Sequence, residues 1–231
     1  MRWNQELEVI FNLCYNYNGD NMNDKKYWNE VYYKNVSKDK LDFLKDSWMN
    51  KYKNIIFNIN GKKAVDLGCG LGQDTAWLIN NGFDVISCDF SKPALEKMKE
   101  LYPNTTTMNF DMQDGLPFDD NSIDLIDANL SLHYFTMDKT IEIFNDIYRV
   151  LKPGGLLIGR VNSDKNSYVN DNCEKIEECF YYEKDSGRHR RLFNKKQFDI
   201  LTKNWKVEIL KEDETIRVGF KKYTWEFVFR K

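Results

Sequence analysis

Short apolar runs alternate with amphipathic stretches through the middle of this chain, from about residue 62 to residue 162. Apolar runs of this length favour buried strands, and the apolar spacing of three and four residues between them favours helices. Their alternation is typical of a parallel sheet covered by helices on both faces. The predicted strands of this region are 64–67, 85–89, 105–110, 123–129 and 156–161.

Capping and turn residues mark where several predicted helices begin and end. Ser91 is a good N-cap, and Pro93 suits the first turn of the helix that follows it. A helix predicted over 138–151 runs into Pro153-Gly154-Gly155, which ends it. The remaining predicted elements are helices over 74–81 and 195–203 and strands over 206–210 and 223–230.

Two segments lie outside this alternation. Residues 1–60 predict two or three amphipathic helices rich in aromatic residues, and residues 163–192 are a long polar and aromatic stretch. Loops of this length in a compact domain are commonly lids or binding segments, or else disordered. We therefore predict a helical cap over 1–60 and a main domain over 61–231, with 163–192 as a lid or insertion.

Composition excludes several classes of partner. The chain has 231 residues and a net charge of −2 with both signs intermixed, so no basic surface for nucleic acid is predicted. It has no apolar run long enough to cross a membrane and no signal pattern, so we expect a cytoplasmic protein without a membrane partner. The five cysteines form no C-x-x-C pair, so neither a disulfide framework nor a metal site is predicted.

The most informative local feature is a glycine-rich turn at the end of the first predicted strand. Gly68, Gly70 and Gly72 alternate with other residues directly before a helix. Glycines let the backbone turn sharply and leave no side chain to keep a ligand away. The following helix directs free N–H groups into the same space. This turn predicts a small-molecule site made largely of backbone.

The spacing and the acids around this turn argue against a dinucleotide. The dinucleotide fingerprint places its third glycine where this chain has Gln73. Asp66, beneath the turn, suits an ammonium group better than a pyrophosphate. Asp89 ends the next strand, where a carboxylate can accept hydrogen bonds from both ribose hydroxyls. A ribose, a cation and no phosphate describe S-adenosylmethionine.

Four ordered motifs between about residues 62 and 162 carry a family resemblance. Residues 65–72 resemble motif I of the class I S-adenosylmethionine-dependent methyltransferases. Residues 111–118 are similar to the family's adenine-contacting segment, 122–129 to its fourth strand, and 149–155 to the turn before its fifth. The resemblance implies a Rossmann-like α/β fold whose seven-stranded, mostly parallel sheet has an antiparallel last strand. It also implies S-adenosylmethionine as cofactor and S-adenosylhomocysteine as product.

The resemblance assigns roles to named residues at the cofactor. Asp66 and the turn would hold the methionine end, and Asp89 the ribose hydroxyls. Asp111 would accept from the adenine amino group, with Asp114 as the alternative partner. Other members of the predicted cofactor site are Gly68, Cys69, Gly70, Gln73, Asp74, Phe90, Met112 and Asn129. Simple helix stabilisation is the alternative for Asp74, and core packing is the alternative for Phe90.

The acceptor side is less defined by sequence. His133 is predicted either as the general base that takes a proton from the acceptor or as a side chain that only bonds a loop. His189, in an Arg-His-Arg-Arg run, is predicted on a solvated basic face, with an anionic acceptor held by these arginines as the alternative. The predicted substrate or lid residues are Tyr27, Trp28, Tyr32 and Arg160, with ordinary helix packing as the alternative for the first two.

These features predict an enzyme that moves a methyl group to an N, O or S atom of a small molecule by in-line displacement. Its partner would be that small-molecule acceptor, and the protein a monomer or homodimer. The alternative is a catalytically silent cofactor-binding protein that acts as a regulator or partner. An RNA or protein methyltransferase is less favoured, because Asn129 is not followed by the Pro-Pro-aromatic run of base-methylating relatives.

Overall fold

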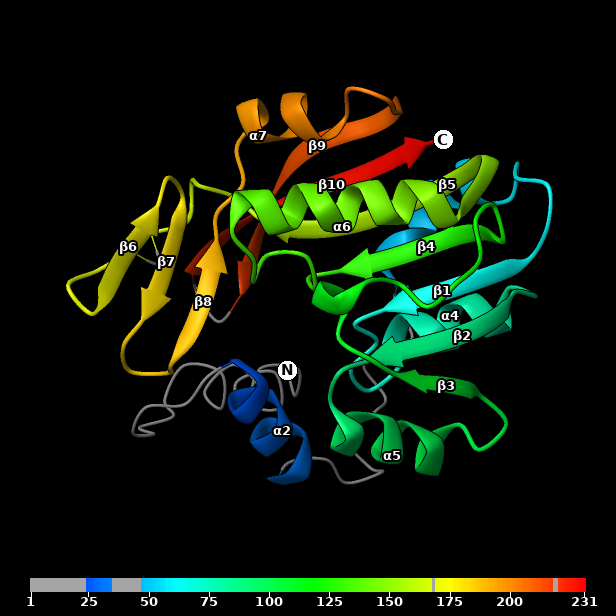
Figure 1. Ribbon diagram of the computed structural model, residues 1–231, viewed down its shortest axis with the longest axis horizontal. Coiled ribbons are helices and arrows are strands. Elements are labelled where there is room, and N and C mark those ends of the chain that lie inside the picture. The colour runs from blue at the N-terminus through cyan, green and yellow to red at the C-terminus, as the bar shows by residue number, and fades with distance from the viewer. Residues whose placement is uncertain (1–23, 35–46, 168, 218–219) are drawn as a thin grey trace.

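A seven-stranded sheet is the middle layer of the computed structural model, which describes residues 24–34, 47–167, 169–217 and 220–231 (Figure 1). Its strand order is β3-β2-β1-β4-β5-β10-β9. The first five strands of this order run parallel, and β10 runs antiparallel to both of its neighbours. The strands are β1 Lys63–Leu67, β2 Asp84–Asp89, β3 Thr106–Asn109, β4 Ile123–Asn129, β5 Leu151–Asn162, β9 Lys206–Arg217 and β10 Phe220–Arg230. The predicted α/β fold with a seven-stranded, mostly parallel sheet is confirmed.

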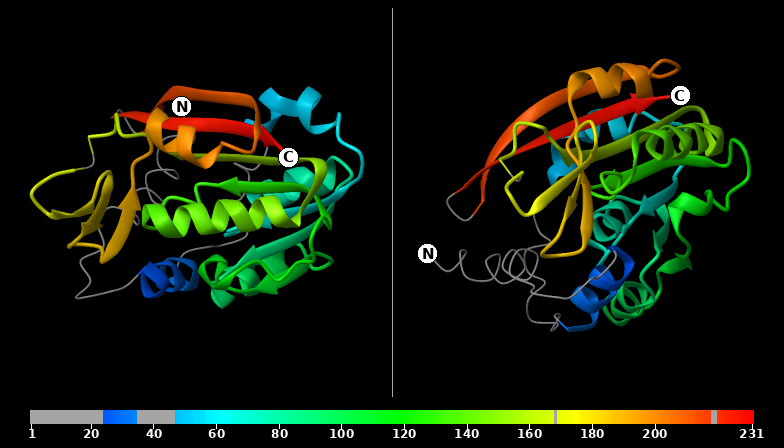
Figure 2. Two further views of the ribbon diagram at one scale, coloured as in Figure 1. Left: turned by 45° about the horizontal axis from the view of Figure 1, so that its top comes forward. Right: turned by 60° about the vertical axis from the view of Figure 1, so that its left-hand side comes forward.

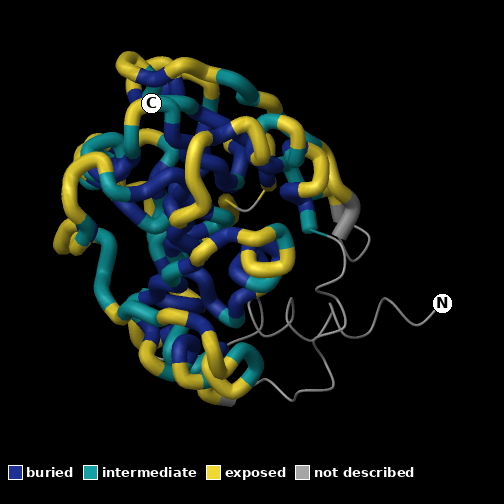
Figure 3. Tube along the Cα trace, turned by 90° about the vertical axis from the view of Figure 1, so that its right-hand side faces the viewer, coloured by how far each residue is buried: buried dark blue, intermediate teal, exposed yellow. Residues whose placement is uncertain are grey.

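Helices cover both faces of this sheet. One face packs on α6 and α7, and the other on η3, α3 and α4, while α5 lies against β2 and β3. Figure 3 shows the buried segments gathered in the interior and the exposed ones at the periphery. The helical elements are α2 Asp24–Lys34, η3 Trp48–Tyr52, α3 Lys53–Ile56, α4 Gln73–Asn80, α5 Lys92–Leu101, η4 Met112–Asp114, α6 Met137–Val150 and α7 Lys195–Leu201.

Side-chain caps fix where the helices start. The Ser91 hydroxyl accepts a hydrogen bond from the Ala94 backbone N–H at 3.3 Å, with Pro93 in the first turn of α5, as predicted. Two strands are longer than predicted: β9 runs on to Arg217 instead of ending at residue 210, and β5 begins at Leu151 instead of residue 156. Leu151 already pairs with Ile123 of β4, and a shift in register absorbs the following turn.

The segment 163–192 contains a second sheet that the sequence pattern did not predict. Its three antiparallel strands are β6 Cys173–Glu177, β7 Phe180–Glu183 and β8 Arg188–Arg191. They escaped prediction because β6 and β8 consist mainly of charged residues and lack an apolar alternation. This small sheet projects beyond the carboxyl ends of the parallel strands and lies beside α2 (Figures 1 and 2).

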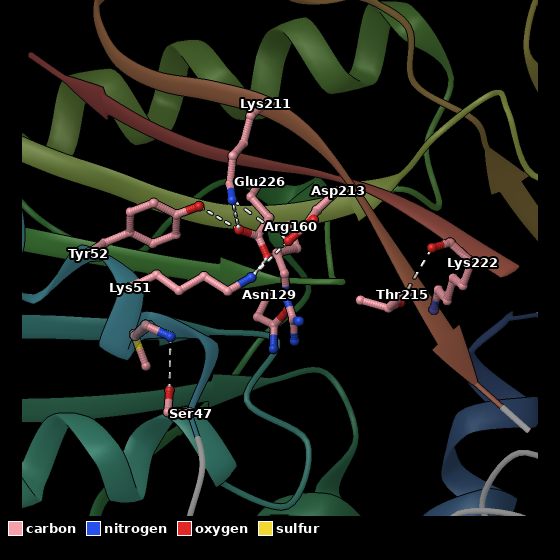
Figure 4. Close-up of polar contacts among 11 residues, drawn as sticks. Ser47, Lys51, Tyr52, Asn129, Arg160, Lys211, Asp213, Thr215, Lys222 and Glu226 are labelled. Atoms are coloured by element: carbon pink, nitrogen blue, oxygen red, sulfur yellow. Dashed lines mark hydrogen bonds and ion pairs between the residues drawn. The ribbon is translucent and has the colours of Figure 1, made fainter.

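The described part of the predicted N-terminal cap consists of α2, η3 and α3. The rest of the segment for which two or three helices are predicted, residues 1–23 and 35–46, lies outside the described residues. A polar network joins η3 to the last strands of the sheet (Figure 4). The carboxylate of Glu226, on β10, is 2% exposed and accepts from the Tyr52 hydroxyl and from the Lys51 Nζ at 3.0 Å. Lys51 also bonds Asp213 of β9 at 2.8 Å. These donors compensate a carboxylate that burial would otherwise make costly.

Phe198 is the side chain on which the packing of α7 depends. It is fully buried and lies 5.4 to 6.1 Å, between ring centroids, from Trp225, Phe227 and Phe229 of β10. We expect Phe198→Ala to lower the free energy of unfolding by about 3–5 kcal/mol through the lost contacts and the cavity that it leaves. Urea denaturation measures this change. Ile200→Ala, on the exposed side of the same helix, is the control and should cost less than about 1 kcal/mol.

Candidate cofactor and acceptor site

The strand order reverses between β1 and β4, which are adjacent although the chain visits β2 and β3 between them. In open α/β sheets, ligands bind outside the carboxyl ends of the strands at such a reversal. Asp66, Asp89 and Asn129 lie at or next to the carboxyl ends of β1, β2 and β4. Because the carboxyl ends of β1, β2 and β4 lie at the same edge of the sheet (Figure 1), the fold brings these predicted site residues to that edge.

The glycine-rich turn between β1 and α4 has no room for a side chain at Gly68 or Gly70. Gly68 and Gly70 have φ angles of +81° and +50°, which L-residues with side chains rarely adopt. A Cβ atom on Gly68 would lie 2.4 Å from the Cβ of Ser131, and one on Gly70 would lie 2.7 Å from the hydroxyl of Tyr32. Neighbouring elements thus approach this backbone closely from the β4 side and from α2.

Asp89 is held rigidly beside this turn. Its side chain is nearly buried and accepts from the Gly70 backbone N–H at 3.0 Å and from the Ser91 backbone N–H at 2.8 Å. Burial raises the pKa of Asp89, and these two backbone donors oppose that rise. A carboxylate has about four acceptor positions, so two backbone bonds leave positions for ribose hydroxyls.

Three acids form a buried group beneath the turn. Asp66 and Asp127 are register partners on β1 and β4, and Asp74 comes from the first turn of α4. The Asp66 carboxylate accepts from the Thr75 hydroxyl at 2.6 Å. Burial and then the Asp74 carboxylate raise the pKa of Asp66 to about 7. Burial and the other two acids raise the pKa of Asp127 well above its usual range.

A chain of hydrogen bonds connects this acidic group to β5. Asn129 donates from Nδ2 to the Asp74 carboxylate at 2.6 Å and accepts at Oδ1 from the Arg160 Nε at 2.9 Å. The Arg160 guanidinium lies 4.9 Å from the ring of Trp48 in η3. Figure 4 shows Arg160 extending toward Asn129 beside the Lys51 and Glu226 network. Asn129 therefore joins the other two predicted residues, Asp74 and Arg160, by direct hydrogen bonds.

The predicted adenine segment is covered by α2. The Asp111 carboxylate accepts from the Gln113 backbone N–H at 3.0 Å and forms an ion pair with the Lys25 Nζ at 2.7 Å. Met112, which opens η4, packs partly against the core, and Phe90 is partly buried after β2. Gln73 is exposed at the start of α4, whereas Cys69 is buried within the turn. Asp114 is exposed, so Asp111 is the better-placed acid of the two alternatives.

Aromatic rings of α2 extend from the turn toward β8. Trp28 stacks with Tyr32 at 5.7 Å and meets Tyr134 edge-on at 6.0 Å, between ring centroids. Tyr27 is 1% exposed, and the Arg188 guanidinium lies 4.3 Å from its ring centre. Tyr134, from the loop after β4, was missed by sequence reasoning, because nothing in its local pattern marks it. These rings form one side of the space outside the turn.

The two histidines occupy different surroundings. His133 is buried, and burial followed by the charges of Arg190, Lys222 and Arg188 lowers the pKa of His133 well below its usual value. His189 is partly buried, and its Nδ1 lies 2.9 Å from the Asp24 carboxylate, which raises the pKa of His189. The prediction that His189 lies on a solvated basic face is wrong, because the arginines on either side of it are buried between the small sheet and the rest of the protein.

Comparison with known proteins agrees with this geometry. Residues 65–159 match a family described as a methyltransferase domain. The fold is similar to the crystal structure of the 1,6-didemethyltoxoflavin-N1-methyltransferase of Burkholderia thailandensis with bound 1,6-didemethyltoxoflavin and S-adenosylhomocysteine. The TM-score is 0.60 at 17% identity, over 84% of this chain and 82% of that chain. Residues 65–159 therefore carry a methyltransferase domain, and the fold is that of S-adenosylmethionine-dependent methyltransferases of known structure.

Two curated members of this family show how far the similarity extends. An uncharacterized methyltransferase of Synechocystis is 36% identical over 96 residues, which are 42% of this chain and 45% of that protein. The tRNA N(3)-methylcytidine methyltransferase trm140 of Schizosaccharomyces pombe is 25% identical over 86% of this chain and 69% of that protein. The chain thus spans less than half of the Synechocystis relative.

The residues present fit the cofactor of this methyltransferase family, S-adenosylmethionine. Three positions of the turn are glycines, and the Asp89 carboxylate is bonded to the turn through the Gly70 backbone N–H. The acids beneath the turn suit a positively charged ligand and disfavour a phosphate. Within the described ranges, no cluster of three or more His, Cys, Asp or Glu residues is arranged to hold a metal ion. Nor is any helix there long and apolar enough to span a membrane.

The raised pKa of Asp66 predicts a pH dependence of stability. Between about pH 4 and pH 7, the folded protein keeps a proton that the unfolded chain has released, so the free energy of unfolding falls as pH rises through this range. Asp66→Asn removes the ionisation and can still accept from Thr75. We expect this variant to gain stability relative to the wild type as pH rises from about 4 to about 8.

Urea denaturation at several pH values measures this difference. Asp84→Asn, which changes an exposed acid at the start of β2, is the control and should show a difference that does not vary with pH. A constant difference for Asp66→Asn as well would show that the Asp66 carboxyl is already ionised at low pH, contrary to the prediction.

Proposed function

We propose that this protein transfers a methyl group from S-adenosylmethionine to an N, O or S atom of a small-molecule acceptor. The observation that carries the proposal is the convergence at one sheet edge of the glycine turn, the fixed Asp89 and the aromatic side of α2. The first two suit the nucleoside, and the aromatic rings lie beside them. The match of residues 65–159 to a methyltransferase domain supports the same chemistry.

The cofactor supplies a methyl group on a sulfonium, which is already a good leaving group. The protein's contribution is therefore to orient the two reactants and to exclude water, which together can lower a barrier by roughly 7–11 kcal/mol. Asp89 and the turn would fix the nucleoside. Trp28 and Tyr32 would shield the reaction from solvent, and their electron-rich faces suit a nearby cation.

His133 is the candidate for proton removal where the acceptor carries a proton. Because burial and neighbouring cations lower its pKa, the imidazole is neutral near pH 7 and has a nitrogen available to accept a proton. The same low pKa makes it a weak base. His133 would therefore help most with an acceptor that is itself acidic.

A small acceptor is favoured over RNA or protein by the enclosure of the site. The side of the turn away from the sheet is covered by α2, and β8 lies beside α2. The net charge of −2 offers no general attraction to a nucleic acid backbone. The similarity to a tRNA methyltransferase of fission yeast makes RNA the acceptor class to test against. We propose a monomer or homodimer located in the cytoplasm, with neither nucleic acid nor membrane as a partner.

A cofactor-binding protein without catalysis is the alternative function. Calorimetry with S-adenosylhomocysteine, followed by turnover with a panel of metabolites and with bulk tRNA, separates the candidates. Binding together with methylation of a metabolite supports the proposal. Methylation of tRNA alone would show that the acceptor is RNA and not a small molecule. Binding without any product favours the regulator, and absence of binding excludes both.

Asp89→Asn tests the ribose assignment. We expect it to weaken S-adenosylhomocysteine binding by about tenfold or more, because a charged hydrogen-bond acceptor contributes about 1.5–3 kcal/mol. Asp84→Asn, at the exposed beginning of the same strand, should bind within about twofold of the wild type. Equal affinity of Asp89→Asn and the wild type would remove Asp89 from the cofactor site, provided that both variants melt at the same temperature.

A further inference from the structure

A group of buried basic side chains lies beyond the aromatic residues of α2. Arg188 and Arg190, on β8, are 4% and 8% exposed. Both guanidiniums bind the Glu183 carboxylate of β7 at 2.8 Å. Arg191 faces the other way, because it bonds the Phe135 carbonyl and Glu177 and therefore has a structural role. The strand β8 thus presents Arg188 and Arg190 on one face.

His133 lies against this basic group and has an unused polar atom. Its side chain is 4% exposed, and its Nδ1 has no hydrogen-bond partner. Its backbone carbonyl accepts from the Arg191 backbone N–H at 2.8 Å, which fixes the loop after β4 to β8. A buried polar nitrogen without a partner costs roughly 1–3 kcal/mol, so its retention calls for an explanation.

The charges that act on His133 are all positive among the described residues. Arg190, Lys222 of β10 and Arg188 lower the pKa of its imidazole, in addition to burial. One carboxylate, Glu183, is shared by the two guanidiniums and offsets part of their charge, whereas Asp24 is bound to His189 on the opposite face of β8. A neutral imidazole can donate one N–H, so side chains with N–H groups from the loop after β4, from β8 and from β10 act on one another here.

Ring contacts connect this basic group to the predicted methyl-transfer site. Tyr27 stacks beneath Arg188, and its neighbour Trp28 contacts Tyr134, which lies 4.4 Å from His133 between ring centroids. Trp28 also stacks on Tyr32, whose hydroxyl lies over Gly70. One row of rings therefore leads from the glycine turn to the basic group.

We propose that the methyl acceptor carries an anionic group, a carboxylate or a phosphate, that binds between His133, Arg188 and Arg190 while its body lies along the aromatic rings of α2. This inference rests on the proposed function and names its substrate class. The anion would accept from His133 and from the guanidiniums, and Lys222 would add long-range attraction. Charge-assisted bonds of this kind are the strongest that a neutral-pH site can offer to such a group.

The test uses nuclear magnetic resonance of the full chain with saturating S-adenosylhomocysteine. The chain has only two histidines, so comparison with a His189→Gln variant assigns the imidazole signals. Benzoate and phenyl phosphate are the anionic probes, and benzamide is the neutral probe of similar shape. We expect at least one of the two anions to shift the His133 signals and to raise the pKa of His133. Benzamide should have neither effect.

Variants identify the residues responsible. Arg190→Gln should weaken binding of the anionic probe by about tenfold or more. Arg230→Gln, remote on β10 beside Glu208, is the matched control and should change it by less than about twofold. Arg190→Gln also removes one partner of Glu183, so it could perturb the small sheet. Lys222→Met is therefore the second variant, because it changes a half-buried side chain that does not bind Glu183. It should weaken binding of the anionic probe several-fold.

Three outcomes overturn the inference. They are His133 signals that no anion moves, equal responses to benzamide and benzoate, and equal losses in Arg190→Gln and Arg230→Gln. Calorimetry on the same sample distinguishes failure of this inference from failure of the proposed function. If S-adenosylhomocysteine binds and the anions do not, only the anionic acceptor is excluded; if the nucleoside itself does not bind, the proposed function fails.

Discussion

The placement of β1 between β2 and β4 is the constraint on which the rest of this structure depends. The chain leaves β1 toward one edge of the sheet and returns on its other side, so no crossover covers the carboxyl ends at this point. Three strands that end in or near acids therefore meet there. Their register sets Asp66 beside Asp127. Burying two neighbouring carboxylates is costly, and bound protons together with hydroxyl and amide donors such as the Thr75 hydroxyl reduce that cost.

The space opened by this topology is then closed by segments from distant parts of the sequence. The loop after β4 is fixed to the glycine turn, since the Ser131 hydroxyl donates to the Leu67 carbonyl at 2.6 Å. Leu130 accepts a positive φ of 56° to make this approach, a strained backbone conformation of the kind that clusters at functional sites. The same loop contacts both α2 and β8. The loop after β4 therefore links the residues expected at the methyl donor to those expected at the methyl acceptor.

The central sheet was predictable because each of its strands carries a local signal. Buried parallel strands are continuous apolar runs, and the glycine turn has a strict spacing, so β4 was placed at its observed bounds. The acids at strand ends followed from the same patterns. The extension of β5 back to Leu151 was missed, because pairing with Ile123 overrides the turn residues that lie between.

The acceptor side was not predictable in the same way. Residues such as Tyr134 and Arg190 come together only after β8 pairs with β7 and docks on the loop after β4. In isolation, Arg-His-Arg-Arg has the composition of a solvated segment, and burial of its guanidiniums depends on Glu183, Glu177 and aromatic rings supplied by other elements. Tertiary pairing of charges leaves no periodic trace in the sequence.

The order of the last two strands has a consequence during synthesis on the ribosome. β9 lies at the edge of the sheet, and its one neighbour there is β10, which follows it in the chain and inserts between β5 and β9. Until β10 has emerged, both β5 and β9 expose strand edges that have no partner. Because translation proceeds at about 5–20 residues per second, nascent chains pass through an interval in which these edges can pair with other molecules. Dependence on chaperones at this late stage would follow directly from the topology.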